Sequence, residues 1–470
     1  MAEYTARIER EDLITFINAC FTCTGQAEFY SSSAEQGVSL SFLHEYIRTN
    51  YRRLYARCLA AGINHYNQAE IVLQLLGAGA PESDADRQEE SRLIRYALSS
   101  LPTQRAYKLL EQAGQRRINN RRCRAVVRQF LAERKNLVFE AVKYRNRMRR
   151  IHSHGHLRSE DELGRFLFGD AAEGRFETPI FDAYRRAHYE ERALYELPYS
   201  VAEGFAAKLS IPRDRFLARI APRMTSAEKA RTARAAEREE IDDWRVDWQR
   251  RDPTQLATYL LSLGIPERRA RLAELEAAMK ASAQRIVREV PYRLGRVSMV
   301  LDNSFSSRGS ADKAHRPLAV ALASLYLVEQ ASASLRAFWT SPIAHPLLAR
   351  AQGSTSLGQA LLDALAWKPD QLLIVSDGFD NDPPNGASEV LRVYCSRLDP
   401  GAEVEIVHLN PVFDAAHLMP RALSSWAPTV GIRDAKDLFL MIGFARFAKG
   451  SMDLQALEAY LQRRMLEVLA

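Results

Sequence analysis

The sequence lacks the features that would place it in a membrane or in the secretory route. No apolar run approaches the roughly 18 residues that a membrane-spanning helix needs. The N-terminal stretch MAEYTARIEREDLI is charged and has no apolar core of a signal peptide. We therefore expect a cytoplasmic protein without a membrane partner.

Cysteine is also scarce, with five residues in a chain of 470. This number excludes a scaffold built on disulfides. Cys20 and Cys23 form one CxxC pair, but a zinc site would need a second pair, and only Cys58, His44 and His65 are loosely near. Metal or redox use of this pair stays open, but buried cysteines that act as small apolar residues are the favoured interpretation.

Positive charge is concentrated in one segment of the chain. The net charge is +7, yet residues 101–157 hold fifteen Arg and Lys against three Glu, so this segment carries +12 and the rest −5. A local excess of positive charge indicates an anionic partner more directly than the total does.

The pattern of apolar residues divides the chain into three parts. Residues 1–290 have apolar residues at spacings of three and four, which predicts an all-α array of helical repeats. Residues 291–450 alternate short apolar strands with helices, which predicts a doubly wound, mostly parallel α/β sheet. The expected strand segments lie at 296–302, 332–341, 371–378, 403–410 and 429–437, and residues 451–470 form an amphipathic helix.

Oxygen-bearing side chains follow the expected strands. Asp302, Ser304 and Ser306 form D-x-S-x-S after the first strand, Thr355 precedes a helix in QGSTSLGQAL, and Asp377 ends the strand in LLIVSDG. Ligands of such sheets bind at the carboxyl ends of the strands, so we expect these side chains at one edge. Two carboxylates and three hydroxyls suit Mg²⁺ or Mn²⁺.

These three motifs resemble the metal-ion-dependent adhesion site of von Willebrand factor A (vWA) domains. The resemblance covers residues 292 to about 450. It implies that the five residues surround one divalent cation, whose open position usually accepts a carboxylate from a partner. The family's usual Gly between the two serines is replaced by Phe305, which is expected to restrict the turn and weaken the metal. The alternative is an inherited site without metal, whose serines cap the next helix.

An enzymatic role for these serines is less favoured than binding. The sequence contains no G-x-S-x-G nucleophile elbow and no histidine in a suggestive position. The vWA family consists of binding modules, so we expect no enzymatic activity.

A basic helix is expected at residues 116–135. One face is apolar and packs inward, with Cys123, Val126, Val127, Phe130 and Leu131. The opposite face is cationic, and together with the following segment it provides the candidate RNA-binding residues Arg117, Arg121, Arg124, Arg128, Lys143, Tyr144, Arg147 and His152. Basic residues interleaved with flat rings suit single-stranded nucleic acid, whereas a solvated arginine-rich face is the alternative.

The N-terminal half resembles the TROVE module of Ro-type RNA-binding proteins. The resemblance is carried by ITFINACFTCTGQAEFYSSSAEQGVSL, by NNRRCRAVVRQFLAERKNLVFEAVKYRNRMRRIHSH and by LEAAMKASAQRIVREVPYRLGRVSMVLDNS. It implies a ring of HEAT-like repeats closed by the vWA domain. Such rings bind small structured RNAs on a basic outer surface and single-stranded 3′ ends in the central hole. The family's D-L-L-R-L run is missing here, and GHLRSEDELGRFL stands in its place.

Two functions are therefore compared. The first is a Ro-like protein that binds small or single-stranded RNA, with an exoribonuclease as a further candidate partner. The second is a vWA adaptor that binds a protein through its metal site, since bacterial proteins that join a helical half to a vWA domain also partner MoxR-type AAA+ ATPases.

Overall fold

The strands form the parallel sheet that the sequence predicts. The computed structural model describes residues 2–157, 161–172, 174–242, 244–290, 293–449 and 453–470. The strand order is β2-β1-β3-β4-β5 and all four pairings are parallel, with β1 (Leu294–Leu301), β2 (Ser332–Trp339), β3 (Gln371–Val375), β4 (Glu405–Asn410) and β5 (Thr429–Gly431). Such a sheet needs helices on both faces, because its central strands are apolar on both sides.

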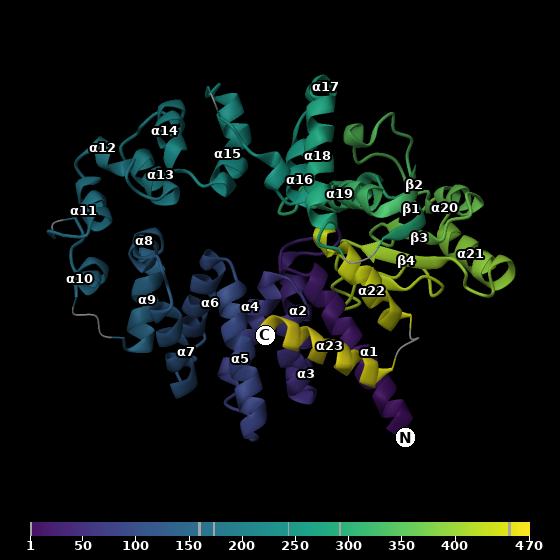
Figure 1. The fold of residues 1–470 in the computed structure, drawn as a ribbon, viewed down its shortest axis with the longest axis horizontal. Helices are drawn as coiled ribbons and strands as arrows, with labels where there is room; N and C mark the ends of the chain where they lie inside the picture. Colours follow the sequence, from purple (N-terminus) through teal and green to yellow (C-terminus); the bar gives the residue numbers. More distant parts are fainter. Residues whose placement is uncertain (1, 158–160, 173, 243, 291–292, 450–452) are drawn as a thin grey trace. The chain divides into compact units, whose positions relative to one another are not determined.

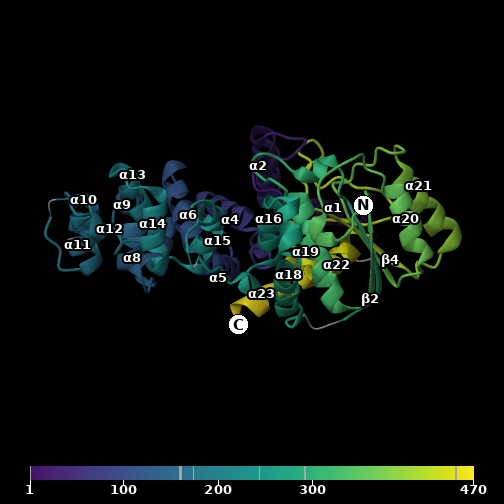
Figure 2. The same ribbon diagram turned by 90° about the horizontal axis from the view of Figure 1, so that it is seen from above.

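Helices cover both faces of this sheet. Figures 1 and 2 show α20 (Leu357–Ala366) and α21 (Gly386–Val393) on one face, and α19 (Arg316–Ala331) and α22 (Leu438–Ala448) on the other. Val300 and Ile374 belong to one buried cluster with Leu361 of α20 and Leu391 of α21. Since side chains alternate along a strand, the neighbouring residues face the opposite helices. The doubly wound arrangement is confirmed.

The N-terminal helices belong to the same compact unit as the sheet. This unit combines the chain up to Gln68 with the chain from Trp248 onward. It includes α1 (Ala2–Thr22), α2 (Ser33–Asn50), α3 (Arg52–Arg57), α16 (Pro253–Ser262), α17 (Ile265–Ala270) and α18 (Leu272–Val287). The Gly431 N–H of β5 donates to Asn18 Oδ1 of α1 at 3.1 Å, which ties the two ends of the chain together. The division of the chain therefore differs from the predicted boundary at residue 290.

The second unit, residues 69–247, is built from helices. It begins within α4 (His65–Gly77) and contains α5 (Asp84–Ser100), α6 (Thr103–Gln115), α7 (Arg121–Ala132), α8 (Leu137–Lys143), α9 (Arg145–Gly155), α10 (Glu162–Phe168), α11 (Pro179–Arg186), α12 (Glu191–Leu194), α13 (Tyr199–Lys208), α14 (Arg213–Ile220) and α15 (Ser226–Arg238). The fully buried Tyr107 donates to Glu140 Oε2 at 2.9 Å, and Arg134 Nε donates to the same oxygen at 2.8 Å. A buried carboxylate is stabilised by such hydrogen-bonded partners.

The expected basic helix at 116–135 is shorter than predicted. It begins at Arg121 because the Asn120 side chain accepts the Cys123 N–H at 2.8 Å and so caps the first turn. Arg117 lies outside the helix with a positive φ of 58°. The helix ends at Ala132, before Lys135. The cationic face of α7 therefore comprises Arg121, Arg124 and Arg128.

The two cysteines of the CxxC pair are buried as expected, as is Cys58. Cys20, Cys23 and Cys58 have no exposed surface, and the Cys23 thiol donates to Gln36 Oε1 at 3.0 Å. The terminal helix is α23 (Leu454–Leu469), while residues 451 and 452 of its predicted range lie outside the described residues. Among the described helices, none combines the length and the apolar character that crossing a membrane requires.

The contact between α1 and β5 gives a direct test of this fold. A Cβ at Gly431 would lie 2.6 Å from Thr22 Cγ2 and 2.8 Å from the Asn18 carbonyl oxygen. We expect Gly431→Ala to lower the free energy of unfolding by about 1–3 kcal/mol through this overpacking, measured by urea unfolding. Gly443→Ala in α22 is the control, because no atom lies within 4 Å and alanine favours the helix. Equal stability of the two variants would contradict the packing.

Candidate functional site

Two carboxylates lie at the ends of adjacent strands. Leu301 of β1 pairs with Val375 of β3, and the N–H of Asp302 donates to the Val375 carbonyl at 2.9 Å. Asp377 follows β3 by two residues, so it reaches the same edge of the sheet. Each aspartate is only 4% exposed. The fold therefore holds two acidic side chains near one another and out of solvent.

The serine hydroxyls join these carboxylates in one cluster. Ser304 donates its N–H to Asp302 Oδ1 at 2.8 Å, and the hydroxyl oxygens of Ser304 and Ser306 are 3.2 Å apart. The Ser306 hydroxyl also lies close enough to the Asp377 carboxylate to act against the rise that burial causes in the pKa of Asp377. Ser304 has an extended conformation, and the short 3₁₀-helix Phe305–Arg308 follows it. This helix brings the Ser306 hydroxyl back toward the sheet.

The loop with Thr355 runs beside the serine loop. Gln352 N–H donates to the Asn303 carbonyl at 2.8 Å, and Phe305 N–H donates to the Gly353 carbonyl at 3.1 Å. The carbonyl of Thr355 accepts the N–H groups of Asn381 and Asp382, which follow Asp377. Thr355 is buried and lies between the two loops that carry the carboxylates. The loop of Thr355 therefore contacts both loops that carry the other four residues predicted for a cation site, and the role of its hydroxyl stays a prediction.

The electrostatics of this edge favour a cation. Burial raises the pKa of Asp302 to about 7, with repulsion from Asp377 as the next cause, and burial also raises the pKa of Asp377. A divalent cation would offset both the cost of burying the charged carboxylates and the repulsion between them. Within the described residues no three His, Cys, Asp or Glu side chains converge on one point, so a cation here would depend on the hydroxyls as well. Hard oxygen donors of this kind fit Mg²⁺ or Mn²⁺.

Phe305 does not displace the serines from this cluster. Its ring is 52% exposed and lies outside the loop, where the Arg308 guanidinium stacks over it at 4.7 Å. The backbone at Phe305 is held by Gly353, and the hydroxyls of Ser304 and Ser306 stay within hydrogen-bonding distance. The expected restriction of the turn is therefore absent from the geometry.

Two polar residues beside the site, Thr340 and Asn410, were missed in the sequence. Thr340, directly after β2, donates to Asp302 Oδ1 at 3.2 Å and to Asn303 Oδ1 at 2.9 Å. Asn410, at the end of β4, donates to the Asp377 carbonyl at 3.0 Å. Both residues stand at the carboxyl ends of strands, where ligands of such sheets bind, so their positions could have been predicted. Their hydrogen-bond partners could not, because these depend on which strands are neighbours.

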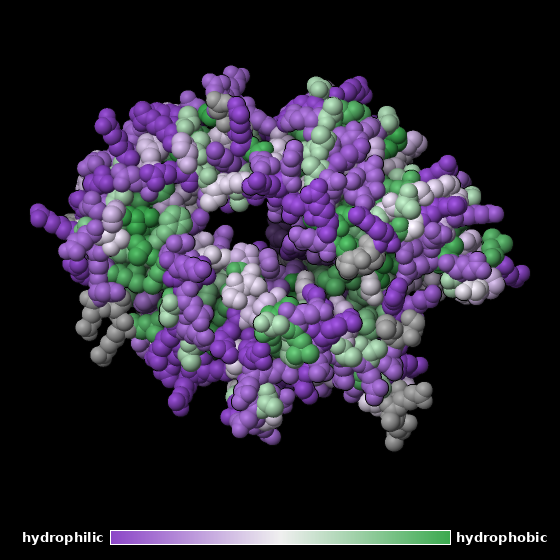
Figure 3. Space-filling model, in the orientation of Figure 1, coloured by the Kyte–Doolittle hydropathy of each residue, from purple (hydrophilic) through white to green (hydrophobic). Residues whose placement is uncertain are grey.

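The basic residues of the second unit differ in their surroundings. Figure 3 shows mainly hydrophilic residues over α5 and α7. Arg121 and Arg128 are exposed on α7, and Arg124 is half-buried. The ion pairs of the described residues include none of these three arginines. The predicted apolar face is largely confirmed, because Cys123, Val127, Phe130 and Leu131 are buried, whereas Val126 is half-exposed.

Other predicted RNA contacts are engaged within the unit. Lys143 Nζ lies 2.9 Å from Glu228 Oε1, and Arg147 Nε lies 3.1 Å from Glu111 Oε2. His152 is 6% exposed, and burial lowers its pKa. Its ring is therefore not presented to a ligand, contrary to the role expected from the sequence.

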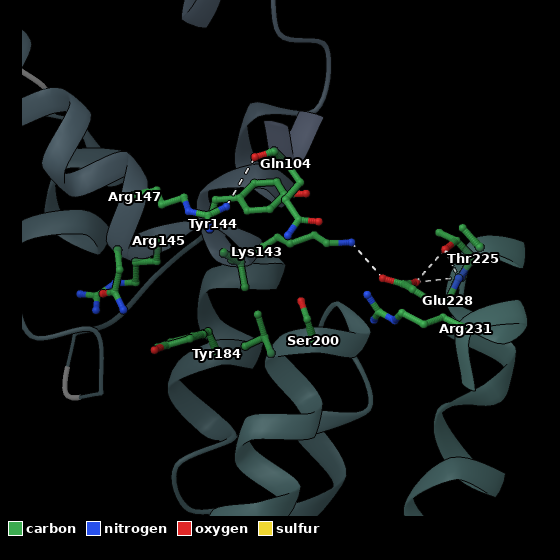
Figure 4. Close-up of a pocket in the computed structure, with 14 residues that line it drawn as sticks. Gln104, Lys143, Tyr144, Arg145, Arg147, Tyr184, Ser200, Thr225, Glu228 and Arg231 are labelled. Carbon is green, nitrogen blue, oxygen red and sulfur yellow. Dashed lines mark hydrogen bonds and ion pairs between the residues drawn. The ribbon is translucent and has the colours of Figure 1, made fainter. Parts of the chain in front are cut away.

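Lys143, Tyr144 and Arg147 nevertheless line a cavity of about 570 Å³. Figure 4 shows its other lining residues, which include Arg145, Tyr184 and Arg231. Lys143 reaches across to Glu228, whose second oxygen accepts the Thr225 N–H at 3.0 Å. The cavity thus combines guanidinium groups with two tyrosine rings, a chemistry that suits phosphates and flat bases.

Comparisons with known proteins bear on the fold. No family model matches the chain, and no curated protein matches it. A solved structure described as the Ro (RSR) protein of Deinococcus radiodurans matches with a TM-score of 0.50 and 14% sequence identity, over 87% of this chain and 94% of that chain. The chain has a Ro-like fold. The likeness concerns the arrangement of helical repeats and sheet, and the roles of individual residues stay predictions.

One buried histidine contacts Ser376, the residue before Asp377. His408 of β4 has no exposed surface and hydrogen-bonds with the hydroxyls of Ser376 and Thr429, each at 2.9 Å. Burial lowers its pKa from 6.5 to about 4. The folded state then binds fewer protons than the unfolded state between these values, so acid destabilises it.

We expect the free energy of unfolding to fall by up to about 3 kcal/mol from this group as the pH drops from 6.5 toward 4. His408→Gln should remove that part of the pH dependence, because glutamine keeps a polar side chain but does not titrate. Urea unfolding of both proteins across this pH range measures the difference. If the free energy of unfolding changed with pH equally in both proteins, His408 would not be the cause of the acid destabilisation.

Proposed function

We propose that this chain is a non-enzymatic RNA-binding protein of the Ro type that also holds a divalent cation in its sheet unit. The Ro-like fold supports the type of protein. The observation that carries the RNA proposal is the set of arginines on α7 that stay outside the ion pairs of the described residues. Neutralisation of phosphates by such side chains supplies most of the affinity for RNA.

The cavity beside α8 and α9 supplies the second part of the RNA surface. Tyr144 stacks on Tyr107 with ring centres 5.0 Å apart, so its ring is fixed before any base arrives. Arg231 lies over the Tyr199 ring, and Lys143 is bound to Glu228. A phosphate that enters this cavity would compete with Glu228 for Lys143. We infer that α7 provides most of the charge and the cavity provides positions for bases.

Binding rather than catalysis is also supported at the sheet edge. In the described part of the chain, the hydroxyls of Ser304 and Ser306 pair with carboxylates and with each other, and no histidine acts as their base. Asp302, Ser304, Ser306, Thr355 and Asp377 would hold the cation, which would supply positive charge and an open position for an anionic ligand. The protein-binding adaptor and the exoribonuclease partner stay predictions from the sequence.

The RNA proposal is tested by removing two exposed arginines of α7. We expect Arg121→Ala with Arg128→Ala to weaken binding of a labelled single-stranded RNA. The salt dependence of log K should become less steep by about 1.4, because each lost phosphate contact contributes about 0.7 for single strands. Fluorescence anisotropy at several salt concentrations gives both values.

The matched control removes the same charge from the same unit. Arg215 and Arg219 both pair with Glu191 Oε1 at 2.8 Å, so Arg215→Ala with Arg219→Ala should change the affinity and the slope little. An equal loss of RNA affinity in both double variants would mean that the net charge of the protein, rather than the cationic face of α7, determines binding.

The cation proposal is tested separately with Mn²⁺. We expect the wild-type chain to bind one Mn²⁺ and Asp302→Ala to lose that binding, measured by the electron paramagnetic resonance signal of free Mn²⁺. Asp363→Ala is the control, since Asp363 is exposed on α20, where it accepts a hydrogen bond from Gln359 at 3.1 Å. Mn²⁺ binding that survives in Asp302→Ala would place the cation elsewhere.

A further inference from the structure

The segment between α1 and α2 lies on the loop of the candidate cation site. The Ala27 N–H donates to Asp312 Oδ2 at 3.3 Å, and the Ala27 carbonyl accepts the Ser310 hydroxyl at 2.7 Å. Glu28, which is 5% exposed, forms an ion pair with Lys313. Residues nearly 300 positions apart in the chain are therefore joined directly beside the serines of the site.

Both ends of this segment are also held. The carbonyl of Cys23 accepts hydrogen bonds from the side chains of Asn64 and Asn67, at 2.8 and 2.9 Å. At the other end, Gln36 Nε2 donates to the Ser31 hydroxyl at 2.6 Å and to the Phe413 carbonyl at 3.1 Å. Anchors on both sides restrict where residues 27–30 can lie.

Phe29 and Tyr30 connect the two loops that carry the carboxylates. The Phe29 ring meets Phe305 edge to face at 6.2 Å, and the Tyr30 ring lies against Phe379 at 4.2 Å. Phe305 lies between the two serines of the site, and Phe379 follows Asp377 by two residues. The Arg421 guanidinium stacks over Phe379 at 4.1 Å, so this ring is held between a cation and Tyr30.

The hydroxyl of Tyr30 points into the cluster. It lies close enough to Ser306, Asp377 and Asp302 for all three to act on it: burial and the charges of the two aspartates raise the pKa of Tyr30, and Ser306 lowers it. The residue as a whole is 48% exposed. Its polar end thus lies among the oxygens of the site, while part of its ring faces solvent. A side chain placed in this way stands between the cluster and the surrounding water.

We propose that Tyr30 is an internal cap on the cation site, and that a carboxylate ligand must displace its hydroxyl to reach the metal. The proposal rests on the cation site proposed above. Tyr30 is well suited to this role because its backbone segment is anchored, whereas its ring is held by ring contacts and one hydroxyl contact. Movement about the side-chain torsions would uncover the site without unfolding the segment. Phe305, in place of glycine, contacts Phe29, the residue next to Tyr30, and so helps to hold this segment beside the site.

The alternative is that Tyr30 only fills space beside Phe379. Two variants distinguish these possibilities. Tyr30→Phe keeps the ring contacts and removes the hydroxyl, whereas Tyr30→Ala removes both. Tyr189→Phe is the control, because Tyr189 is 69% exposed and belongs to the other unit.

The experiment uses the full-length chain loaded with Mn²⁺, with acetate as the carboxylate probe. Relaxation of water protons reports both the water that exchanges at bound Mn²⁺ and its displacement by acetate. We expect Tyr30→Phe to bind acetate about fivefold more tightly, the factor that corresponds to one net hydrogen bond. Tyr30→Ala should do the same and should also raise the proton relaxation, because water gains access. Tyr189→Phe should behave as the wild type.

Three other results would overturn the cap. Unchanged acetate affinity and relaxation in both Tyr30 variants, with Mn²⁺ still bound, would show that Tyr30 does not restrict access. Weaker acetate binding in Tyr30→Phe would show that the hydroxyl assists the ligand instead of competing with it. Absence of Mn²⁺ binding in the wild type would overturn the cation site itself, and the cap with it.

Discussion

The burial of two carboxylates at neighbouring strand ends is the constraint on which the sheet unit depends. The parallel pairing of β1 with β3 leaves Asp302 and Asp377 at one edge, and ionised groups removed from water need compensation. The surrounding chain supplies it through backbone N–H groups, the hydroxyls of both serines and the side chain of Thr340. A divalent cation would complete this compensation, and so the same arrangement that costs stability creates a binding site.

The same edge explains why the N-terminal helices join the sheet unit. The chain between α1 and α2 brings Glu28 to Lys313 and Tyr30 to Ser306, while Asn18 pairs with the backbone of β5. Each of these contacts satisfies a polar group that the sheet would otherwise leave open. The sheet and its helices therefore do not form an independent C-terminal module, and the first 68 residues are part of its structure.

Local patterns predicted the sheet well and the tertiary contacts poorly. The apolar runs indicated each strand, and the helix at Arg316–Ala331 has the bounds that its apolar stretch suggests. The five residues of the cation site were predictable because the ends of parallel strands converge. Tyr30 was not, since its role depends on packing across almost the whole length of the chain and no periodic signal marks it. The late start of α7, at Arg121, reflects the Asn120 cap, which the charge pattern concealed.

Ion pairing, rather than the number of cations, determines which basic residues can meet a phosphate. Residues 101–157 carry a large positive excess in the sequence, yet partners from distant helices neutralise several of them: Glu70 pairs with Arg116, Glu90 with Arg122 and Glu228 with Lys143. Within the segment, Glu111 accepts both Arg147 and Arg150. A phosphate must displace these carboxylates, whereas on α7 it displaces only water and counterions. Fewer cations are therefore accessible than the composition suggests, and the exposed face of α7 holds some of them.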